Sequence, residues 1–424
     1  MTKRRSAFTW GPISKKQMQL LTWWREGSPY ADYDMIAAEG SIRSGKTVVG
    51  SFSFVDWAHT TFDSQEFALC GKTIKSLRRN VVTPLKKVLS GRGYKVKDNK
   101  SDNELRISKN GNESLFYLFG GKDEASQDLI QGVTLAGIFF DEAALQPESF
   151  VNQGIGRCSV DGSKMWFNCN PGSPFHWFKT DYIDKAEEKR MLVLHFELDD
   201  NMTISKAIKD RYKRMFTGVF YQRYILGLWV MASGIIYDCF NSSKHVKEKQ
   251  EFNKYAVGVD YGIANPTAFV KLGYNSVKDM QVVDEYYHNG RETKKQKTDS
   301  EYADDLEKFC GGDKTMTVIL DPSALSFKVE LRRRGFTNVR DAKNSVLDGI
   351  RFVASALHED RLSIAKHCTN ILKEFMAYIW DEKRQCKGED VPIKSHDHAL
   401  DALRYLIYTL FGRSTGGINN EFRL

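Results

Sequence analysis

The sequence predicts an α/β protein with two domains, and three observations support this fold class. A glycine-rich loop near residue 40 lies between a short apolar segment and a helical pattern. Short apolar runs that end in a polar or acidic residue recur on both sides of a polar stretch at 241–250. Helical patterns lie between several of these runs, as is typical of sheets flanked by helices.

The composition agrees with two folded domains. The chain has 424 residues, of which 41% are hydrophobic and 12% aromatic, and this excludes a wholly disordered chain. No apolar run approaches the roughly 18–20 residues that span a bilayer, so we expect no membrane segment. We place the first domain at 1–231, a linker at 232–250 and the second domain at 251–424.

The first domain carries a phosphate-binding motif. The apolar segment at 34–39 is followed by Gly-Ser-Ile-Arg-Ser-Gly-Lys-Thr and then by a helical pattern. This is G-x-x-x-x-G-K-T between a strand and a helix, where backbone N–H groups cradle phosphates. Lys46 is expected to reach the β- and γ-phosphates, and Thr47 to bind Mg²⁺. The predicted ATP-binding residues of this loop are Gly40, Ser41, Ile42, Arg43, Ser44, Gly45, Lys46 and Thr47.

A second motif supplies a carboxylate for the same site. The run at 133–140 has a buried-strand pattern and ends in Asp141 and Glu142, a Walker B pattern. Asp141 is predicted to hold the ATP-bound Mg²⁺ through water, and Glu142 to position and polarise the attacking water. A glutamate in this place favours a hydrolase over a kinase.

Three further features of the first domain have open alternatives. The strand at 164–168 ends in Asn168, with Asn170 close behind. Either amide is predicted to sense the nucleotide and couple it to movement, although an ordinary Asn-Pro-Gly turn is the alternative. Gln17 is a candidate for reading adenine or simply a surface residue. Arg43 or Arg157 is a candidate arginine finger, acting in cis or from a neighbouring subunit, and Arg157 has a structural ion pair as its alternative.

A basic segment lies within the first domain. Residues 72–109 contain twelve Lys and Arg against three acids, within a chain of net charge +8. Such a segment gains affinity for DNA by neutralising phosphates and releasing counterions. A solvated helix face and hairpin explains the same pattern equally well.

The second domain contains spaced carboxylates. Strand patterns end in Asp260 and Asp321, two further strand patterns at 267–272 and 280–287 suggest an antiparallel meander, and 396–405 is amphipathic at helical spacing. On that helix Asp397 and Asp401 share one face, and His398 lies near it. Asp260, Asp321 and Asp401 are what a two-metal nuclease needs to hold two divalent ions, Mg²⁺ or Mn²⁺. Zinc is disfavoured because no compact three-ligand cluster accompanies the histidines.

Together these motifs resemble the large terminase subunit of tailed double-stranded-DNA bacteriophages, with the PBSX-type enzymes of phages of Gram-positive bacteria the most similar. The resemblance covers nearly the whole chain. Its motifs are G-S-I-R-S-G-K-T at 40–47, I-F-F-D-E-A at 138–143, N-C-N-P at 168–171, G-V-D-Y-G at 258–262, L-D-P-S at 320–323 and H-D-H-A-L-D-A-L-R-Y at 396–405.

The resemblance implies an N-terminal P-loop NTPase domain with a RecA/ASCE-like parallel sheet and a C-terminal RNase H-like nuclease domain. It implies an ATP-driven motor that moves double-stranded DNA into a procapsid and a metal-dependent endonuclease that cuts concatemeric DNA. The implied nuclease ligands are Asp260, Asp321 and Asp401, with Asp397 and His398 as auxiliary groups. The family also has a glutamine before the P-loop, which Gln17 matches, with Gln19 as a second candidate.

The implied partners are DNA, a small terminase subunit and the portal protein of the procapsid. A homo-oligomeric ring on the portal is expected, and the free chain as a monomer is compatible with it. The expected location is the host cytoplasm, with transient docking on the procapsid and absence from the mature virion. Two alternatives stay open: a helicase-like ATPase whose second domain binds nucleic acid without cleaving it, and a non-catalytic structural protein.

Overall fold

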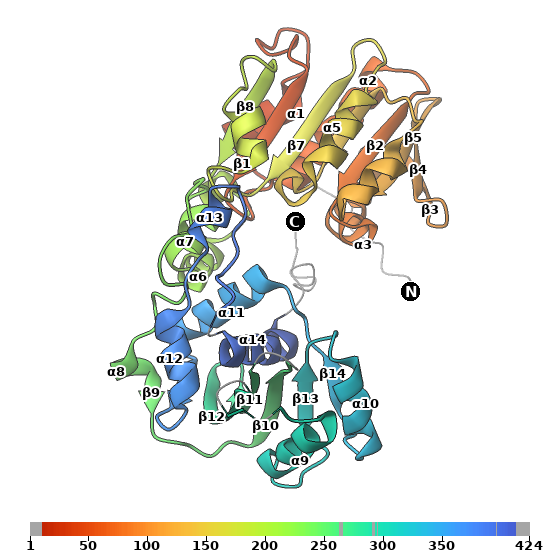
Figure 1. Ribbon diagram of the computed structural model, residues 1–424. Coiled ribbons are helices and arrows are strands. Elements are labelled where there is room, and N and C mark those ends of the chain that lie inside the picture. The colour runs from red at the N-terminus through yellow and green to blue at the C-terminus, as the bar shows by residue number, and fades with distance from the viewer. Residues whose placement is uncertain (1–10, 263–265, 291–292, 295, 396, 413–424) are drawn as a thin grey trace, which may run out of the picture.

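The computed structural model describes residues 11–262, 266–290, 293–294, 296–395 and 397–412. Within these residues the chain forms two α/β units, each built around one mixed sheet (Figure 1). The first sheet has eight strands and the second has seven. The predicted α/β fold class with two sheet-based units is therefore confirmed.

The first sheet has the order β3-β4-β5-β2-β6-β7-β1-β8. All its pairs are parallel except those of the β3-β4-β5 edge, which are antiparallel. Its strands are β1 (Met35–Gly40), β2 (Glu66–Gly71), β3 (Lys95–Asn99), β4 (Glu104–Lys109), β5 (Asn112–Gly120), β6 (Gly137–Phe140), β7 (Lys164–Cys169) and β8 (Met191–Phe196).

Helices cover both faces of the first sheet and make a three-layer unit. One face packs against α1, α2, α3 and α4 through apolar residues such as Phe54 and Trp166, and the other packs against α5. These helices are α1 (Lys15–Thr22), α2 (Lys46–Thr61), α3 (Ile74–Leu77), α4 (Thr83–Ser90) and α5 (Glu148–Gly156). Strand β1 leads into the P-loop and α2, as the sequence predicts.

The second sheet has the order β14-β13-β10-β11-β12-β15-β9. β10, β11 and β12 form an antiparallel meander, which confirms that expectation, and β13 pairs with β10 in parallel. Its strands are β9 (Val246–Lys247), β10 (Lys254–Asp260), β11 (Thr267–Ser276), β12 (Asp279–His288), β13 (Thr317–Leu320), β14 (Val339–Asp341) and β15 (Leu362–Ala365).

Helices also cover the second sheet on two faces. One core contains side chains of α11, α12 and α14, and a smaller one on the other face contains side chains of α9 and α10. These helices are α9 (Asp299–Phe309), α10 (Leu325–Arg333), α11 (Val346–His358), α12 (Thr369–Ala377) and α14 (His398–Phe411), whereas α13 (Glu382–Gln385) has no residue in either core. None of the helices in the described parts of the chain has the length and apolar character to cross a membrane.

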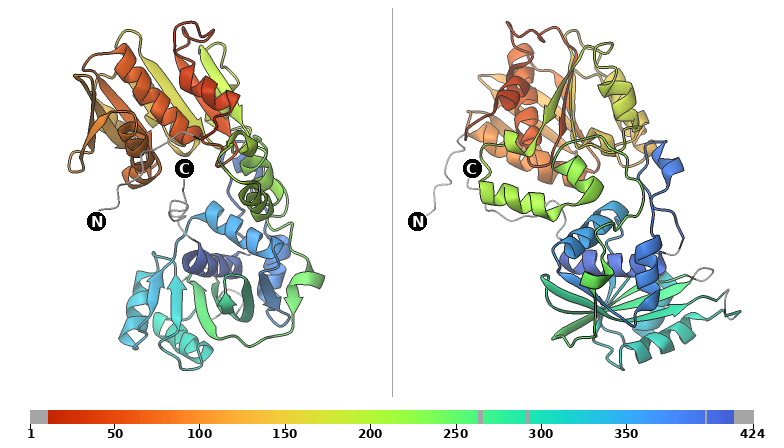
Figure 2. Two further views of the ribbon diagram at one scale, coloured as in Figure 1. Left: turned by 180° about the vertical axis from the view of Figure 1, so that it is seen from behind. Right: turned by 90° about the vertical axis from the view of Figure 1, so that its left-hand side faces the viewer.

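Two segments run between the units. Helices α6 (Lys206–Met215) and α7 (Gly218–Tyr224) follow the first sheet, yet Tyr212, Phe216 and Phe220 pack into the larger core of the second unit. The chain later returns, and α13 lies beside α7 near the first sheet (Figure 1). The side view shows the green and the blue connecting segments at separate places (Figure 2). The units are therefore joined at two points of the sequence.

The predicted linker at 232–250 takes part in this junction. Ile236 N–H donates to the carbonyl of Tyr378, and Trp380 N–H donates to the carbonyl of Gly234. Within the same range, α8 (Ser242–His245) leads into β9, which pairs with β15. The boundaries 231 and 251 remain predictions, because backbone pairing of the linker is not a test of where a domain folds alone.

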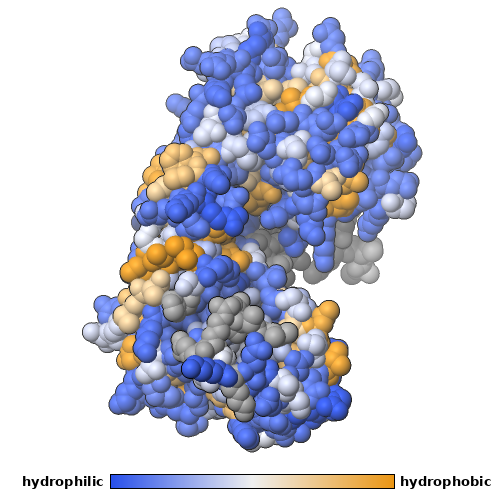
Figure 3. All heavy atoms as spheres, in the orientation of Figure 1, coloured by the Kyte–Doolittle hydropathy of each residue, from blue (hydrophilic) through white to orange (hydrophobic). Residues whose placement is uncertain are grey.

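Apolar side chains are exposed at the junction. The face in Figure 3 is mostly hydrophilic, with orange patches along its left-hand edge where the units meet. The connecting segments contribute exposed apolar side chains, among them Leu228, Ile235 and Ile379.

The fit of α14 against β10 predicts the effect of one methyl group. A Cβ at Gly258 would lie 2.1 Å from the carbonyl oxygen of Ala402, a backbone atom that cannot move alone. We expect Gly258→Ala to lower the free energy of unfolding by about 2–3 kcal/mol, because it separates the helix from the strand. The measurement is the midpoint of urea unfolding followed by fluorescence.

Gly156 provides the matched control, since its Cβ would meet no atom within 4 Å. Gly156→Ala should leave the midpoint unchanged or raise it. Equal midpoints for the two variants would contradict the close approach of α14 to β10.

Candidate active sites

The P-loop turns sharply between β1 and α2. Gly40 has a φ of 124° and Gly45 a φ of 90°, conformations that favour glycine. A Cβ at Gly40 would lie 2.1 Å from the carbonyl oxygen of Phe196 in β8. Only glycine allows the neighbouring strand to come this close, so backbone packing explains the first residue of the motif.

Backbone groups from later in the chain hold the loop in place. The carbonyl of Tyr224, the last residue of α7, accepts from the Ser41 hydroxyl at 2.9 Å and from the Ile42 N–H at 2.9 Å. The Asn201 amide donates to the carbonyl of Arg43 at 2.8 Å. The loop therefore rests on the segment that connects the two units.

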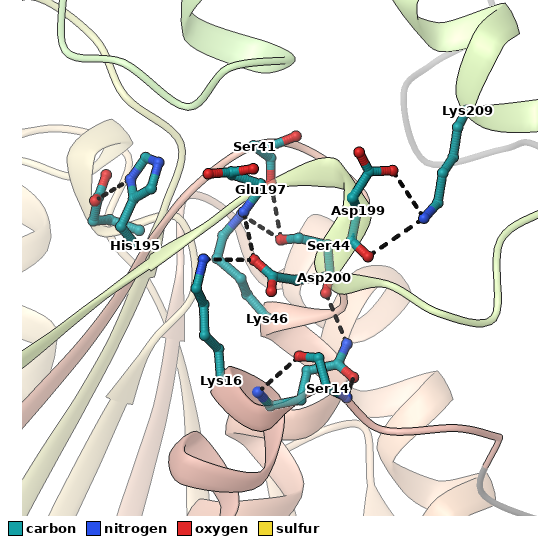
Figure 4. Close-up of polar contacts among 12 residues, drawn as sticks. Ser14, Lys16, Ser41, Ser44, Lys46, His195, Glu197, Asp199, Asp200 and Lys209 are labelled. Atoms are coloured by element: carbon teal, nitrogen blue, oxygen red, sulfur yellow. Dashed lines mark hydrogen bonds and ion pairs between the residues drawn. The ribbon is translucent and has the colours of Figure 1, made fainter. Parts of the chain in front are cut away.

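The predicted adenine reader bonds the loop itself. Gln17 is buried, its Nε2 donates to the carbonyl of Ser44 at 2.8 Å, and its Oε1 accepts from the N–H of Ser14 (Figure 4). Both ends of the amide thus have protein partners in this structure, and its role toward adenine stays a prediction. Gln19, the second candidate, is half-buried on the same helix. Lys16 also ties α1 to this region through Asp200 at 3.1 Å.

Lys46 points into the P-loop. Its Nζ lies 3.2 Å from the carbonyl oxygen of Gly40 and 2.5 Å from that of Ser41. It also lies 3.2 Å from the Ser44 hydroxyl and 3.3 Å from Asn170 Oδ1 (Figure 4 labels Lys46, Ser41 and Ser44). Burial lowers the pKa of Lys46 to about 8. A buried cation whose partners are neutral oxygens is well placed to receive an anion, and a phosphate fits this role.

Asn168 connects the two motifs. β7 lies between β1 and β6, so its end meets both the P-loop helix and the Walker B residues. The Asn168 amide donates to Asp141 Oδ1 at 2.8 Å and to the Thr47 hydroxyl at 3.2 Å, and its Oδ1 accepts from the Glu142 N–H. The hydroxyl of Thr47 and Oδ1 of Asp141, the two groups predicted to hold Mg²⁺, lie 3.5 Å apart. Asn168 thus lies at the end of the strand beside these groups, and its role in sensing the nucleotide stays a prediction.

The charged forms of Asp141 and Glu142 are unfavourable side by side. Burial and the nearby Glu142 raise the pKa of Asp141 to about 7, and burial also raises the pKa of Glu142. Glu142 has a φ of 56°, which is costly for a residue other than glycine and is found at functional sites. Two neighbouring acids, one buried and one half-buried, favour the binding of a cation at this place.

The two candidate arginine fingers lie in different places. Arg43 is half-buried in the P-loop, with a φ of 59°. Arg157 follows α5, and its carbonyl accepts from Leu135, before the amino end of β6. Leu135 and Asp141 are six residue steps apart along an extended segment, a distance of roughly 20 Å. The geometry therefore does not support Arg157 acting in cis, whereas a role toward a neighbouring subunit remains a prediction.

Several contacts of this site carry no sequence signal. Glu39 is buried in β1, where Oε1 lies 2.7 Å from His195 Nδ1 and Oε2 accepts from Trp229 at 3.0 Å. The hydrogen bond to Glu39 raises the pKa of His195. Asp348 and Arg351 of α11 belong to the second unit, yet they act electrostatically on Glu142. No motif spacing identifies these residues, because Glu39 and His195 meet only when β1 pairs with β8, and Asp348 and Arg351 come near only when the units pack.

The three predicted nuclease aspartates lie near the carboxyl ends of two neighbouring strands of the second sheet. Asp260 ends β10, Asp321 follows the neighbouring β13, and Asp401 lies in the first turn of α14, which packs on β10. Burial raises the pKa of Tyr405, one turn after Asp401, and the nearby charges of Asp401, Asp260 and Asp321 raise it further. Parallel pairing and the helix packing thus bring the predicted set together.

The environments of these aspartates differ. Burial raises the pKa of Asp260, and His398 Nδ1 lies 2.8 Å from its Oδ2. Burial favours the neutral form of Asp321 as well, but hydrogen bonds from Ser323, Tyr405 and Asn344 outweigh it and lower its pKa. His398 therefore contacts a nuclease aspartate directly, as expected for an auxiliary group.

Asp401 has two cationic partners in this structure. The buried Arg404 donates to Asp401 Oδ1 at 2.9 and 3.1 Å, and Lys394 Nζ lies 2.9 Å from Oδ2. Lys394 also lies 3.2 Å from Oδ2 of the buried Asp397, an oxygen for which the described residues supply no well-aligned hydrogen-bond donor. The sequence does not identify Lys394 and Arg404 as partners of Asp401, since Lys and Arg near an acidic helix are common on surfaces.

The carboxylate oxygens and the unsatisfied oxygen of Asp397 fit a hard divalent cation. Among the described residues, however, no three His, Cys, Asp or Glu side chains are gathered closely enough to hold a metal ion. The donor types are suitable, and closing them around an ion requires side chains such as Lys394 to move. His396, which belongs to the same motif, lies outside the described residues.

Glu374 of α12 supports the helix that carries Asp401. Its Oε2 accepts from the Leu400 N–H at 2.9 Å, and it occupies the place of a cap that the Asp397 side chain does not supply. Burial raises the pKa of Glu374 to about 7. A buried acid on another helix gives no local capping pattern, so the sequence does not reveal it.

The chain is similar to the large terminase of a thermophilic bacteriophage. One structure of that protein has a TM-score of 0.91 at 55% identity, covering 94% of this chain and 99% of that one. Its complex with ADP has a TM-score of 0.89 at 55% identity, covering 95% and 100%. Its complex with ATP-gamma-S has a TM-score of 0.88 at 54% identity, covering 94% and 99%.

Two sequence comparisons agree. Residues 38–244 match the family described as "Terminase large subunit, T4likevirus-type, N-terminal". The terminase large subunit of Escherichia phage T5 is 25% identical over 332 residues, which is 74% of this chain and 73% of that protein.

The raised pKa of Asp141 predicts a pH-dependent cost. The folded-state pKa of Asp141, about 7, lies above the ordinary value of 3.8. The contribution of this carboxyl group to the free energy of unfolding is therefore fully present below about pH 4 and is lost as the pH rises through 7. Asp141→Asn keeps an acceptor for Asn168 and removes this charge. We expect the variant to be more stable at pH 8 by about 1–3 kcal/mol without nucleotide. Urea unfolding at pH 5 and pH 8 measures the difference.

The exposed Asp161 provides the control, and Asp161→Asn should follow the wild-type pH dependence. If Asp141→Asn gains as much stability at pH 5 as at pH 8, the buried charge is not the cause.

Proposed function

Because the chain belongs to the family of bacteriophage large terminases, we propose that it hydrolyses ATP to move double-stranded DNA into a procapsid and cuts concatemeric DNA with its second domain. The observation that carries the proposal is the position of Asn168 between Thr47 and Asp141. It joins the phosphate loop, the predicted metal groups and the end of a third strand in one site.

ATP with Mg²⁺ is the proposed nucleotide, in keeping with the ADP and ATP-gamma-S complexes of the similar terminase from the thermophilic phage. Lys46 and the P-loop N–H groups would bind the phosphates, and Thr47 and Asp141 would hold the ion. Mg²⁺ supplies charge neutralisation of the transferring phosphoryl group when it is bound. Glu142 orients the attacking water and accepts its proton, and burial raises its pKa, which makes the carboxylate a stronger base.

Coupling is proposed to run through β7. Lys46 holds Asn170 in the present arrangement, and a bound phosphate would compete for the same ammonium. Asn168 and Asn170 would then change partners as nucleotide binds and leaves. Because the Tyr224 carbonyl holds the P-loop from α7, this change also reaches the helices that pack on the second unit.

For the nuclease we propose two divalent ions, Mg²⁺ or Mn²⁺, held by Asp260, Asp321 and Asp401. Such ions activate a water and stabilise the leaving oxygen of the phosphodiester when they are bound. Asp397 and His398 would support this set, His398 by orienting Asp260. Attack on the backbone needs no base reading, so site choice would fall to a partner.

The proposed DNA-gripping surface is the basic segment at 72–109, which spans α3, α4, β3 and β4. Arg78 and Lys86 pair with Asp98 at 2.7 and 2.9 Å, and most of the other cations are exposed. Exposed cations on one edge of the first sheet can contact a phosphate backbone without fixing its register.

The remaining assignments are proposals of the same kind. They include a small terminase subunit and the portal as partners, a homo-oligomeric ring on the portal, an arginine finger, and action in the host cytoplasm with docking on the procapsid. They also include the PBSX-type branch with a Gram-positive host, and the domain ranges 1–231 and 251–424 with the linker at 232–250.

The ATPase assignment predicts two inactive variants. Lys46→Ala removes the phosphate contact and Glu142→Gln removes the base, so each should lower the rate of DNA-stimulated ATP hydrolysis by about 100-fold or more. Phosphate release measures this rate, and Lys185→Ala, at an exposed ion pair, is the control. Hydrolysis that persists in Glu142→Gln at the wild-type rate would refute the role of Glu142.

The nuclease assignment predicts a separation of activities. Asp260→Asn should reduce Mn²⁺-dependent cleavage of plasmid DNA by about 100-fold or more and leave ATP hydrolysis intact. The exposed Asp279 supplies the control variant Asp279→Asn. Cleavage that survives both Asp260→Asn and Asp321→Asn would place the nuclease site elsewhere and favour a second domain that only binds DNA.

A further inference from the structure

Lys394 lies at the mouth of the nuclease carboxylates. Its Nζ is 2.9 Å from Asp401 Oδ2 and 3.2 Å from Asp397 Oδ2. The two aspartate side chains are 7% and 5% exposed, whereas that of Lys394 is 62% exposed. An exposed, flexible cation therefore covers two buried anions, and moving it away disturbs no packed core.

The segment that carries Lys394, residues 381–394, contacts both the first unit and α7 of the junction; we call it the strap. The Ser173 hydroxyl donates to the carbonyl of Gln385 at 3.1 Å. Arg223 of α7 makes a two-pronged ion pair with Asp390, at 2.5 and 3.1 Å. Both of these charged side chains are buried, so the pair is a fixed anchor rather than a surface contact.

The strap also touches the backbone of the first unit. A Cβ at Gly388, which has a φ of 82°, would lie 2.8 Å from the Cα of His176 and 3.0 Å from the carbonyl oxygen of Phe175. The two backbones are thus in direct contact, and a shift of residues 173–176 displaces the strap.

Residues 173–176 follow the ATPase coupling segment directly. Asn170 bonds Lys46 at 3.3 Å, and Ser173 lies three residues further along the chain. Only Pro171 and Gly172 lie between Asn170 and Ser173 in the chain. A displacement of Asn170 at the phosphate-binding lysine is therefore transmitted to the strap over a short distance. From Ser173 the path continues along the strap to Lys394.

We propose that Lys394 is a displaceable cation of the nuclease site, one that competes with the divalent ions and is held in place by the ATPase unit through the strap. This inference rests on the proposed nuclease. It names the regulation of that site: the nuclease is restrained while the strap holds Lys394 over Asp397 and Asp401. A divalent ion and an ammonium cannot neutralise the same oxygens together, because like charges at this distance repel.

The first test is Mn²⁺ binding by the nucleotide-free full-length chain, followed by electron paramagnetic resonance of free Mn²⁺. Asp260→Asn in each background gives the signal from other sites. Lys394→Gln should lower the Kd for Mn²⁺ by roughly five- to tenfold, because it removes a competing charge near 3 Å at a wet surface. Lys387→Gln, at an exposed lysine of the same strap, should leave the Kd unchanged.

The second test examines the tie to the ATPase unit. Ser173→Ala removes the hydrogen bond from the Ser173 hydroxyl to Gln385 and loosens the strap. Like Lys394→Gln, it should lower the Kd for Mn²⁺, here by about two- to threefold. In the double variant with Lys394→Gln it should add nothing, because the strap then carries no competing charge. Ser163→Ala removes a similar bond to the carbonyl of Cys158, away from the strap, and is the control.

Two results overturn the proposal. If Lys394→Gln binds Mn²⁺ no more tightly than the wild type, Lys394 does not compete with the metal, whatever happens to cleavage. If Ser173→Ala is without effect or adds fully to Lys394→Gln, the ATPase unit does not hold the lysine. A wild-type chain that binds Mn²⁺ but never cleaves DNA counts against the nuclease alone, since the Kd comparison still decides the role of Lys394.

Discussion

The register of β7 between β1 and β6 is the constraint on which the nucleotide site depends. Parallel pairing aligns the carboxyl ends of these strands, so the residues that follow them meet at one edge. Asn168 then has a donor for Thr47 and Asp141 and an acceptor for the Glu142 N–H. A shift of one residue would turn the amide to the other face and leave the buried acids without it.

The same principle operates in the second sheet with a different outcome. β10 and β13 deliver two aspartates side by side, and α14 completes the set because Gly258 lets the helix backbone approach the strand. Arg404 and Lys394 then neutralise the helix aspartate. Nearby cations thus stabilise the carboxylates of each site, Lys46 at the first and both Arg404 and Lys394 at the second.

The junction between the units is more than a covalent linker. The Tyr224 carbonyl supports the P-loop, while neighbouring side chains of α7 pack into the core of the second unit. The Arg351 guanidinium of α11 lies 5.2 Å from the centre of the Tyr224 ring. The chain then returns to the first unit through Asp390 and Arg223. A rearrangement of either active site therefore changes contacts at this junction.

Local motifs in the sequence were enough to give the fold class of each unit. They also predicted the acids of both sites and the residues of the P-loop. A strand–glycine loop–helix pattern or an aspartate that ends an apolar run needs only neighbours in the chain. It also predicted that Asn168 lies beside the nucleotide, since a strand end has a defined place in a parallel sheet. Tertiary structure alone decided that Arg157 lies far from this chain's nucleotide site and that α6 and α7 contribute to the second core. It also decided that Lys394 contacts Asp401 and that Glu374 of α12 bonds the first turn of α14. Those contacts join residues with no fixed spacing, and they depend on how the helices pack and which charges burial forces together.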